Sequence, residues 1–83
     1  MEPPLGFEVR AVGVEPGGHR IYYEAEWGDA IVIVECGEVE LECLGGARRR
    51  FRRGDFLWLA GLPLRALHNP GQDPVLLVAV SRR

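Results

Sequence analysis

The chain has 83 residues, of which 47% are hydrophobic and 27% are charged, the balance of one small folded domain and not of a disordered chain. No apolar stretch approaches the roughly 20 residues that a membrane-spanning helix needs, and the net charge of -2 gives no general attraction for nucleic acid or membrane surfaces. We therefore expect neither nucleic acid nor a membrane as a partner.

Strands dominate the predicted elements. The 11 glycines and 6 prolines interrupt the chain at intervals of roughly 8 to 12 residues, and no segment shows the three-and-four spacing of apolar residues that is typical of a helix. In chain order, the predicted strands cover residues 7–14, 20–27, 31–36, 38–43, 47–52, 56–59, 65–68 and 75–80. This pattern predicts an all-β fold of about eight short strands with essentially no helix, closed or nearly closed into a barrel.

The sequence begins with MEPPLGF, which ends at the first residue of the first predicted strand. This segment lacks the positive region and the apolar core of a signal peptide, so we expect a cytoplasmic protein. The 2 cysteines, Cys36 and Cys43, are too few for a disulfide scaffold and are expected to be reduced thiols in the core.

Two glutamates lie in the predicted strand 20–27. Glu24 and Glu26 are two residues apart, so a strand would place both carboxylates on one face, with backbone positions about 6.8 Å apart. Alternation in the same strand places Tyr23 and Trp27 on the opposite face. Either the glutamates face solvent, or they face the interior and a partner subunit covers Tyr23 and Trp27.

The segment GEVELECLGGARRRFRRGD predicts a hairpin between strands 38–43 and 47–52. A three-residue loop at 44–46 would set each glutamate opposite an arginine, pairing Glu42 with Arg48, Glu40 with Arg50 and Glu38 with Arg52. Opposite charges across a ladder contribute roughly 0.2 to 1 kcal/mol each, and less when exposed. We expect the arginines to be neutralised inside this hairpin, with a patch that binds anions or nucleic acid as the alternative.

The glycines also match the spacing of a known family. Residues 18–37 follow the first cupin motif, G-x5-H-x-H-x3-E-x6-G, and residues 54–69 follow the second, G-x5-P-x-G-x2-H-x3-N, from Gly54 to Asn69. From about residue 14 to residue 80 the chain resembles a small cupin of the cupin 2 conserved-barrel type. The resemblance implies a single domain over residues 1–83, folded as a small antiparallel jelly-roll barrel with a pocket inside.

Each position that binds metal in metal-bearing cupins departs from the motif. Glu24 and Glu26 stand where the first motif has its two histidines, Ala30 replaces its glutamate, and Arg65 replaces the histidine of the second motif. A guanidinium is always protonated and offers only donors, so Arg65 would repel a metal ion. We expect no cofactor; if a hard divalent cation did bind, Glu24 and Glu26 would be its ligands.

We expect five pocket residues, of which the resemblance gives Glu24, Glu26, Ala30 and Arg65, and the fifth is Trp58. If the register holds, the two glutamates and Arg65 converge as a buried ionic cluster in which one carboxyl pKa is raised. Phe56 and Trp58 share a strand face that we expect to fill the core, with Trp58 as a stacking surface in the pocket as the alternative.

Three functions are consistent with this pocket, and the sequence identifies no catalytic residue. The leading prediction is a module that binds or senses a sugar-like or anionic metabolite. The alternatives are a cupin enzyme, an isomerase, epimerase or oxygenase-like activity using Glu24 and Glu26 as acid/base groups or metal ligands, and an interaction scaffold. Because so small a domain buries little core, we also expect a homodimer.

Overall fold

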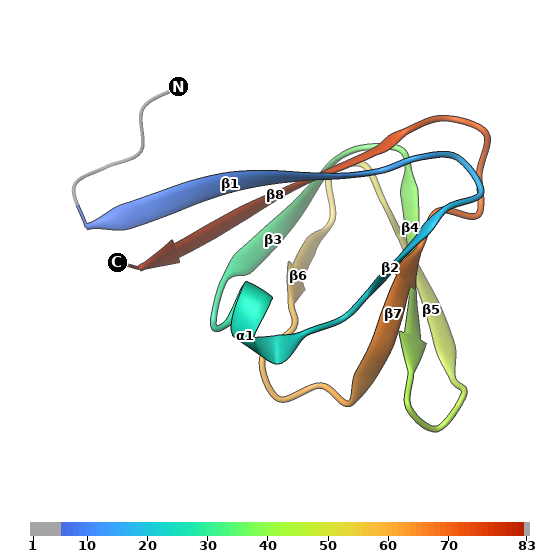
Figure 1. The fold of residues 1–83 in the computed structure, drawn as a ribbon. Helices are drawn as coiled ribbons and strands as arrows, with labels where there is room; N and C mark the ends of the chain where they lie inside the picture. Colours follow the sequence, from blue (N-terminus) through green and yellow to red (C-terminus); the bar gives the residue numbers. More distant parts are fainter. Residues whose placement is uncertain (1–5, 83) are drawn as a thin grey trace.

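The structure, a computed structural model, describes residues 6–82, which form eight strands and one helical turn (Figure 1). The elements are β1 (Phe7–Val14), β2 (His19–Ile21), α1 (Glu24–Trp27), β3 (Ile31–Cys36), β4 (Glu38–Cys43), β5 (Arg48–Arg52), β6 (Phe56–Trp58), β7 (Leu64–His68) and β8 (Val75–Arg82). The predicted all-β fold is confirmed. Residues 1–5 lie outside the described residues. They include most of the amino-terminal segment on which the expectation of a cytoplasmic protein rests.

The strands form two four-stranded sheets that face one another across the core. The first sheet has the order β1-β8-β3-β6 and the second the order β2-β7-β4-β5. Every paired neighbour is antiparallel. Consecutive strands alternate between the sheets except at the β4–β5 hairpin, which is jelly-roll connectivity. The one helical turn is far too short to span a bilayer, and the described residues contain no other helix.

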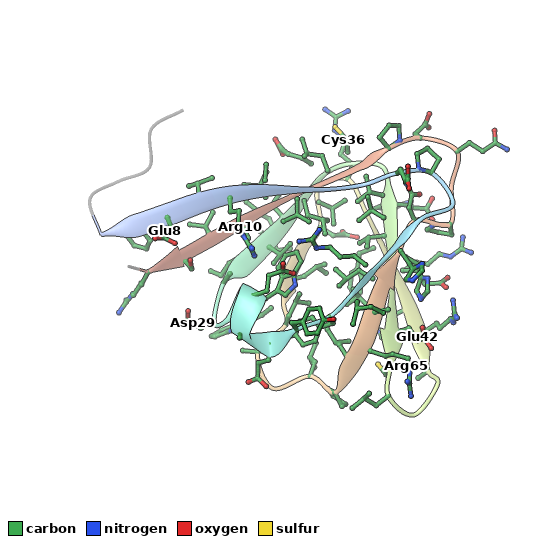
Figure 2. The ribbon with its side chains drawn as sticks, in the orientation of Figure 1. Glu8, Arg10, Asp29, Cys36, Glu42 and Arg65 are labelled. Carbon is green, nitrogen blue, oxygen red and sulfur yellow. The ribbon has the colours of Figure 1, made fainter. Side chains whose placement is uncertain are left out.

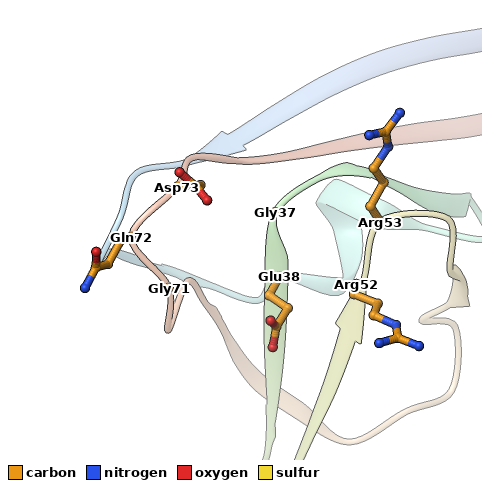
Figure 3. Close-up of a pocket in the computed structure, with 7 residues that line it drawn as sticks. All are labelled: Gly37, Glu38, Arg52, Arg53, Gly71, Gln72 and Asp73. Atoms are coloured by element: carbon orange, nitrogen blue, oxygen red, sulfur yellow. The ribbon is translucent and has the colours of Figure 1, made fainter.

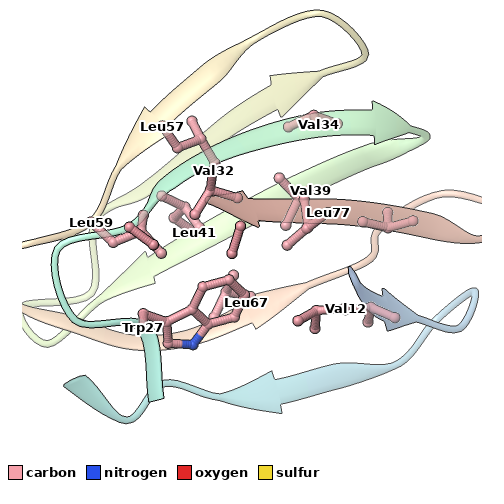
Figure 4. Close-up of a cluster of buried hydrophobic side chains, with 14 of the residues drawn as sticks. Val12, Trp27, Val32, Val34, Val39, Leu41, Leu57, Leu59, Leu67 and Leu77 are labelled. Atoms are coloured by element: carbon pink, nitrogen blue, oxygen red, sulfur yellow. The ribbon is translucent and has the colours of Figure 1, made fainter. Parts of the chain in front are cut away.

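Alternate residues of both sheets point inward, so apolar side chains occupy the space between them (Figure 4). Leu67 of the second sheet and Leu77 of the first are both 0% exposed. Trp27, from α1, is 2% exposed and lies among them. Its burial contradicts the expectation that Trp27 forms a subunit interface.

The β4–β5 hairpin has the predicted register. Glu38 pairs with Arg52, Glu40 with Arg50, and Glu42 with Arg48. The side chains also interact diagonally, since Arg48 lies 2.8 Å from Glu40 and Arg50 lies 3.5 Å from Glu38. Ion pairs within the hairpin therefore neutralise Arg48 and Arg50, as predicted, whereas within residues 6–82 no ion pair between Arg52 and Glu38 accompanies their pairing in the ladder.

The glycine that closes the first motif has a steric role. Gly37 joins β3 to β4 with a φ of 77°, and a Cβ atom there would lie 2.7 Å from the carbonyl oxygen of Pro74. Any side chain would therefore collide with the loop before β8, while glycine adopts this backbone conformation without strain.

Three expectations about individual side chains are wrong. Phe56 and Trp58 do not fill the core; they are 70% and 66% exposed, because the inward position of β6 belongs to Leu57, between them. Cys36 is exposed and not a core thiol, since a bulge between Val34 and Cys36 shifts the end of β3. Cys43 is partly buried against the core.

Candidate functional site

The predicted strand 20–27 ends early. The β2–β7 pairing ends at Ile21, and the chain then forms the single helical turn α1, closed by a hydrogen bond from the Gly28 N–H to the Glu24 carbonyl of 2.8 Å. Residues two apart on a helix point to different sides, so Glu24 and Glu26 do not share a face. The physical reason for the turn is Trp27, which it brings into the core.

Glu26 is the residue of α1 that meets the rest of the barrel. Arg20, on β2, donates to both of its carboxylate oxygens, from Nη2 at 2.7 Å and from Nε at 3.3 Å. Arg10, on β1, donates from Nη2 to the Glu26 carbonyl at 2.8 Å, and its Nη1 lies 3.9 Å from the Glu26 carboxylate. Figure 2 shows Arg10 projecting from β1 toward α1. We call Arg10, Arg20 and Glu26 the mouth cluster.

One residue of the mouth cluster, Arg10, lies over an aromatic ring. The Arg10 guanidinium carbon is 5.2 Å from the centre of the Trp27 ring, a cation–π contact that holds the arginine over the core. Trp27 Nε1 and Tyr22 Oη are both buried.

The electrostatics of the cluster follow from these contacts. Hydrogen bonds from Arg20, with the positive charges of Arg20 and Arg10, hold the pKa of Glu26 below its ordinary value despite partial burial. Burial raises the pKa of Tyr22, and the nearby Glu24 carboxylate adds to that shift. The expectation that the two glutamates raise a shared pKa is therefore not met at Glu26, which stays ionised as an acceptor.

Arg65 lies away from the mouth cluster, on the other side of the second sheet. On β4, Glu42 pairs with Ala66 of β7, and the next residue, Cys43, pairs with Leu64. Arg65 has no partner in this ladder and is the extra residue of a β-bulge. Its Nη2 donates to the Leu44 carbonyl at 3.3 Å, and its Nε lies 3.6 Å from Glu42 (Figure 2). The structure therefore does not bring Arg65 together with Glu24 and Glu26.

The other two predicted pocket residues lie on opposite sides of the first sheet. Ala30 is buried in the core beside Trp27. Trp58 projects from the outer face, where it lines a cavity of about 330 Å³ with Asp29 and Arg82. Only Glu26 of the predicted set belongs to the mouth cluster.

Sequence analysis missed Arg10 and Arg20. The available signal for Arg10 was its position in the strand, because strand alternation places it on the same face of β1 as the buried Val12 and Val14. Arg20 was hidden because its partner lies six residues away across a turn, a spacing that a continuous strand would not bring together.

The four family positions do not fit a metal ion. One is the aliphatic Ala30, one is the cationic Arg65 in a bulge, and Glu26 is already bonded to two arginines. Among residues 6–82, no group of three or more histidine, cysteine, aspartate or glutamate side chains is arranged to hold one. His19 and His68 do not replace the lost ligands, since their rings stack at 5.7 Å and His68 pairs with Glu42 at 2.8 Å on the outer face of the second sheet.

A further cavity, of about 200 Å³, lies at the loops joining β3 to β4 and β7 to β8 (Figure 3). Glu38, Asp73, Arg52 and Arg53 are the charged residues that line it. Its charges are balanced and it lies away from α1, so it does not extend the mouth cluster.

Solved structures with the same fold bear on the family. No protein-family model and no curated protein matches the sequence. A cupin 2 conserved barrel domain protein from Salinispora arenicola is similar at 29% identity and a TM-score of 0.70, over 96% of this chain and 68% of that one. The Cupin_2 domain of an XRE family transcriptional regulator from Enterobacter cloacae is 25% identical, with a TM-score of 0.71, over 95% of this chain and 83% of that domain.

Ectoine synthase from P. lautus has the same fold, with 22% identity and a TM-score of 0.66, and this chain spans 54% of its length. The jelly-roll topology, the two motif spacings and these neighbours agree. The chain has the fold of a small cupin domain, and the positions that bind metal in the two cupin motifs hold Glu24, Glu26, Ala30 and Arg65.

Proposed function

We propose that this barrel is a binding or sensing module for a small sugar-like or anionic metabolite, held at the mouth cluster. The observation that supports it most directly is the convergence of Arg10 and Arg20, from two strands, on Glu26 beside the buried Trp27. Two guanidinium groups and one carboxylate leave a net positive charge in this cluster.

The donors and acceptors suit a hydroxylated acid. Arginine binds carboxylate or phosphate through paired N–H donors, and an ionised glutamate accepts from hydroxyl groups. Arg20 is already oriented by its two bonds to Glu26, and Arg10 by Trp27, so ligand binding orders few additional side chains. The solved cupin domain of a transcriptional regulator supports a sensing role for a domain of this size.

Binding accounts for Glu26 better than the enzymatic alternative does. A general acid near neutral pH needs a raised carboxyl pKa, whereas the pKa of Glu26 is lowered and its oxygens are occupied by Arg20. Glu24 is exposed on the other side of α1 and does not complete an acid/base pair.

A thermal-shift and calorimetry screen of sugar acids, hydroxy acids and the matching neutral sugars tests the proposal. We expect an acid to bind, Arg20→Gln to weaken that binding at least about tenfold, and Arg65→Gln to leave it unchanged. Arg65 is the matched control, because it is an exposed arginine paired to a glutamate away from the mouth. The absence of any hit, or equal losses in both variants, would contradict the proposal.

Elemental analysis of the purified protein addresses the metal alternative independently. Stoichiometric iron, manganese, nickel or zinc that is lost on Glu26→Ala would show that the cluster is a metal site and would replace the metabolite proposal.

A further inference from the structure

The outer face of the first sheet is apolar over all four strands. Pairing aligns its side chains in two rows, the first of Val9, Val80, Ile31 and Trp58, and the second of Ala11, Val78, Ile33 and Phe56. Gly13, Leu76 and Cys36 follow in a shorter third row. We call these three rows the apolar face. It points away from the barrel core, so the core does not account for its composition.

The exposure of this face is large for so small a protein. Trp58 and Phe56 are 66% and 70% exposed, and Ile31, Val9 and Leu76 are 49%, 39% and 36% exposed. From typical side-chain areas, these five residues expose on the order of 500 Å², a patch of the size that marks an interaction site. Two copies packed through it would bury about 1,000 Å² from these residues alone, the lower limit of a specific interface.

Large and small residues are segregated on the apolar face. The edge strand β6 presents Phe56 and Trp58, whereas the opposite edge strand β1 presents Val9, Ala11 and Gly13. A hollow of about 640 Å³ lies beside Gly13 and Leu76. A two-fold axis along the strands would set the aromatic residues of one copy over the small residues of the other, twice, which is the self-complementarity of an isologous interface.

We propose that the apolar face binds a second copy of this chain, in a two-fold dimer whose main anchors are Phe56 and Trp58. Size favours that partner, because an 83-residue domain has a small core and gains stability by burying a further face. A lipid surface fits less well, because it would require basic side chains around the face. Among residues 6–82, the basic residues that line the two cavities at its ends are Arg53 and Arg82, and each cavity is also lined by an aspartate.

The proposal replaces the interface expected from the sequence. That interface used Tyr23 and Trp27, but Trp27 is buried in its own barrel and Tyr23, 62% exposed, lies outside the apolar face. Tyr23 therefore supplies a matched control, an aromatic residue with nearly the exposure of Trp58.

Sedimentation velocity and light scattering of the full chain, in reducing agent and over a hundredfold concentration range in the micromolar region, test the dimer. We expect the wild type to be a dimer, Trp58→Glu and Phe56→Glu each to raise the dissociation constant at least about 100-fold, and Tyr23→Glu to remain a dimer. Circular dichroism spectra should confirm that all three variants are folded, since the substituted positions are exposed.

A thiol-labelling measurement on the unmodified protein provides a second readout. Cys36 belongs to the apolar face and Cys43 does not, so maleimide labelling of Cys36 should slow as the concentration rises while labelling of Cys43 stays constant. A wild-type protein that is a monomer at all concentrations would overturn the proposal. If that monomer also bound neutral lipid vesicles, the apolar face would be a lipid-binding surface instead. Dissociation by Tyr23→Glu but not by Trp58→Glu would equally overturn the proposal.

Discussion

The two sheets have equivalent inner faces and opposite outer faces. Inward, both contribute fully buried aliphatic residues, such as Leu67 and Leu77. Outward, the second sheet presents alternating charges on β4 and β5 with His68 on β7, whereas the first presents Ile31, Phe56 and Trp58. If water covered both outer faces, polar side chains would be favoured on both of them.

In both sheets every second residue faces outward, but these outward residues differ between the two sheets. On the second sheet, the residues between the core positions pair with one another across the ladder and remain compatible with solvent. On the first sheet, the equivalent positions are apolar and gain only if another surface covers them. The charged outer face is therefore suited to contact with water, and the apolar face is suited to the second copy that we propose.

The largest effect that we predict tests the equivalence of the two inner faces. Leu67→Ala and Leu77→Ala each remove a fully buried side chain, one from each sheet, and each should lower the free energy of unfolding by about 2–5 kcal/mol. Urea denaturation at one fixed protein concentration measures both. A near-wild-type midpoint for either variant would show that its sheet contributes little to the shared core.

The next effect concerns the link between the sheets. Asn69, 2% exposed at the end of β7, donates to the Val14 carbonyl of β1 at 3.0 Å and to the Asp73 carbonyl at 2.8 Å. Asn69→Ala leaves the carbonyl of Val14 without this donor, so we expect a loss of about 1–3 kcal/mol in urea denaturation. Gln72→Ala, an exposed change in the adjacent loop, is the control and should have almost no effect.

Much of the fold followed from local patterns in the sequence. β1, β3 and β4 have the predicted bounds, because alternation and flanking turns define a strand without reference to the rest of the chain. The β4–β5 register was predictable because the three-residue loop aligns the same residues that the three pairs of opposite charges favour as partners. Gly37 was correctly assigned to a turn, where only glycine fits.

The candidate site was predictable only in part, because it depends on contacts between distant segments. Alternation described Tyr23 and Trp27 as one strand face, yet burying the Trp27 ring outweighs strand continuity and produces α1. Motif spacing placed Arg65 in the pocket, but a bulge, which spacing does not reveal, turns it to Glu42. The exposure of Phe56 and Trp58 could not be predicted for another reason, since aromatic residues are typical both of a core and of an exposed apolar face.

A smaller effect, of pH, is expected on the charged face alone. Hydrogen bonds from Arg48 and then Arg50 hold the pKa of Glu40 below its ordinary value of 4.5. A carboxylate whose pKa is lower in the folded state stabilises the fold above its unfolded-state pKa and loses that contribution as the pH falls through the folded-state pKa. Glu40→Gln should therefore reduce the loss of stability on acidification below pH 4.5.

Urea midpoints measured between neutral and acidic pH check this expectation. Glu35→Gln is the matched control, because Glu35 is an exposed glutamate on β3 for which no ion pair is recorded among the described residues. Equal acid sensitivity in the two variants would mean that the Glu40 contacts do not stabilise the fold.

The smallest predicted effect, of salt, has opposite signs on the two outer faces. At 1 M salt the screening length is about 3 Å, comparable with the separations of Arg48, Arg50 and their glutamates, so these exposed pairs weaken. Apolar association does not weaken in salt, and sulfate strengthens it. In sodium sulfate we therefore expect the dimer dissociation constant to fall. In sodium chloride the unfolding midpoint should drop slightly more for the wild type than for Glu40→Gln. If salt instead dissociated the dimer, charged groups would hold the two copies together. Such a result would contradict the proposal that the apolar face forms the interface.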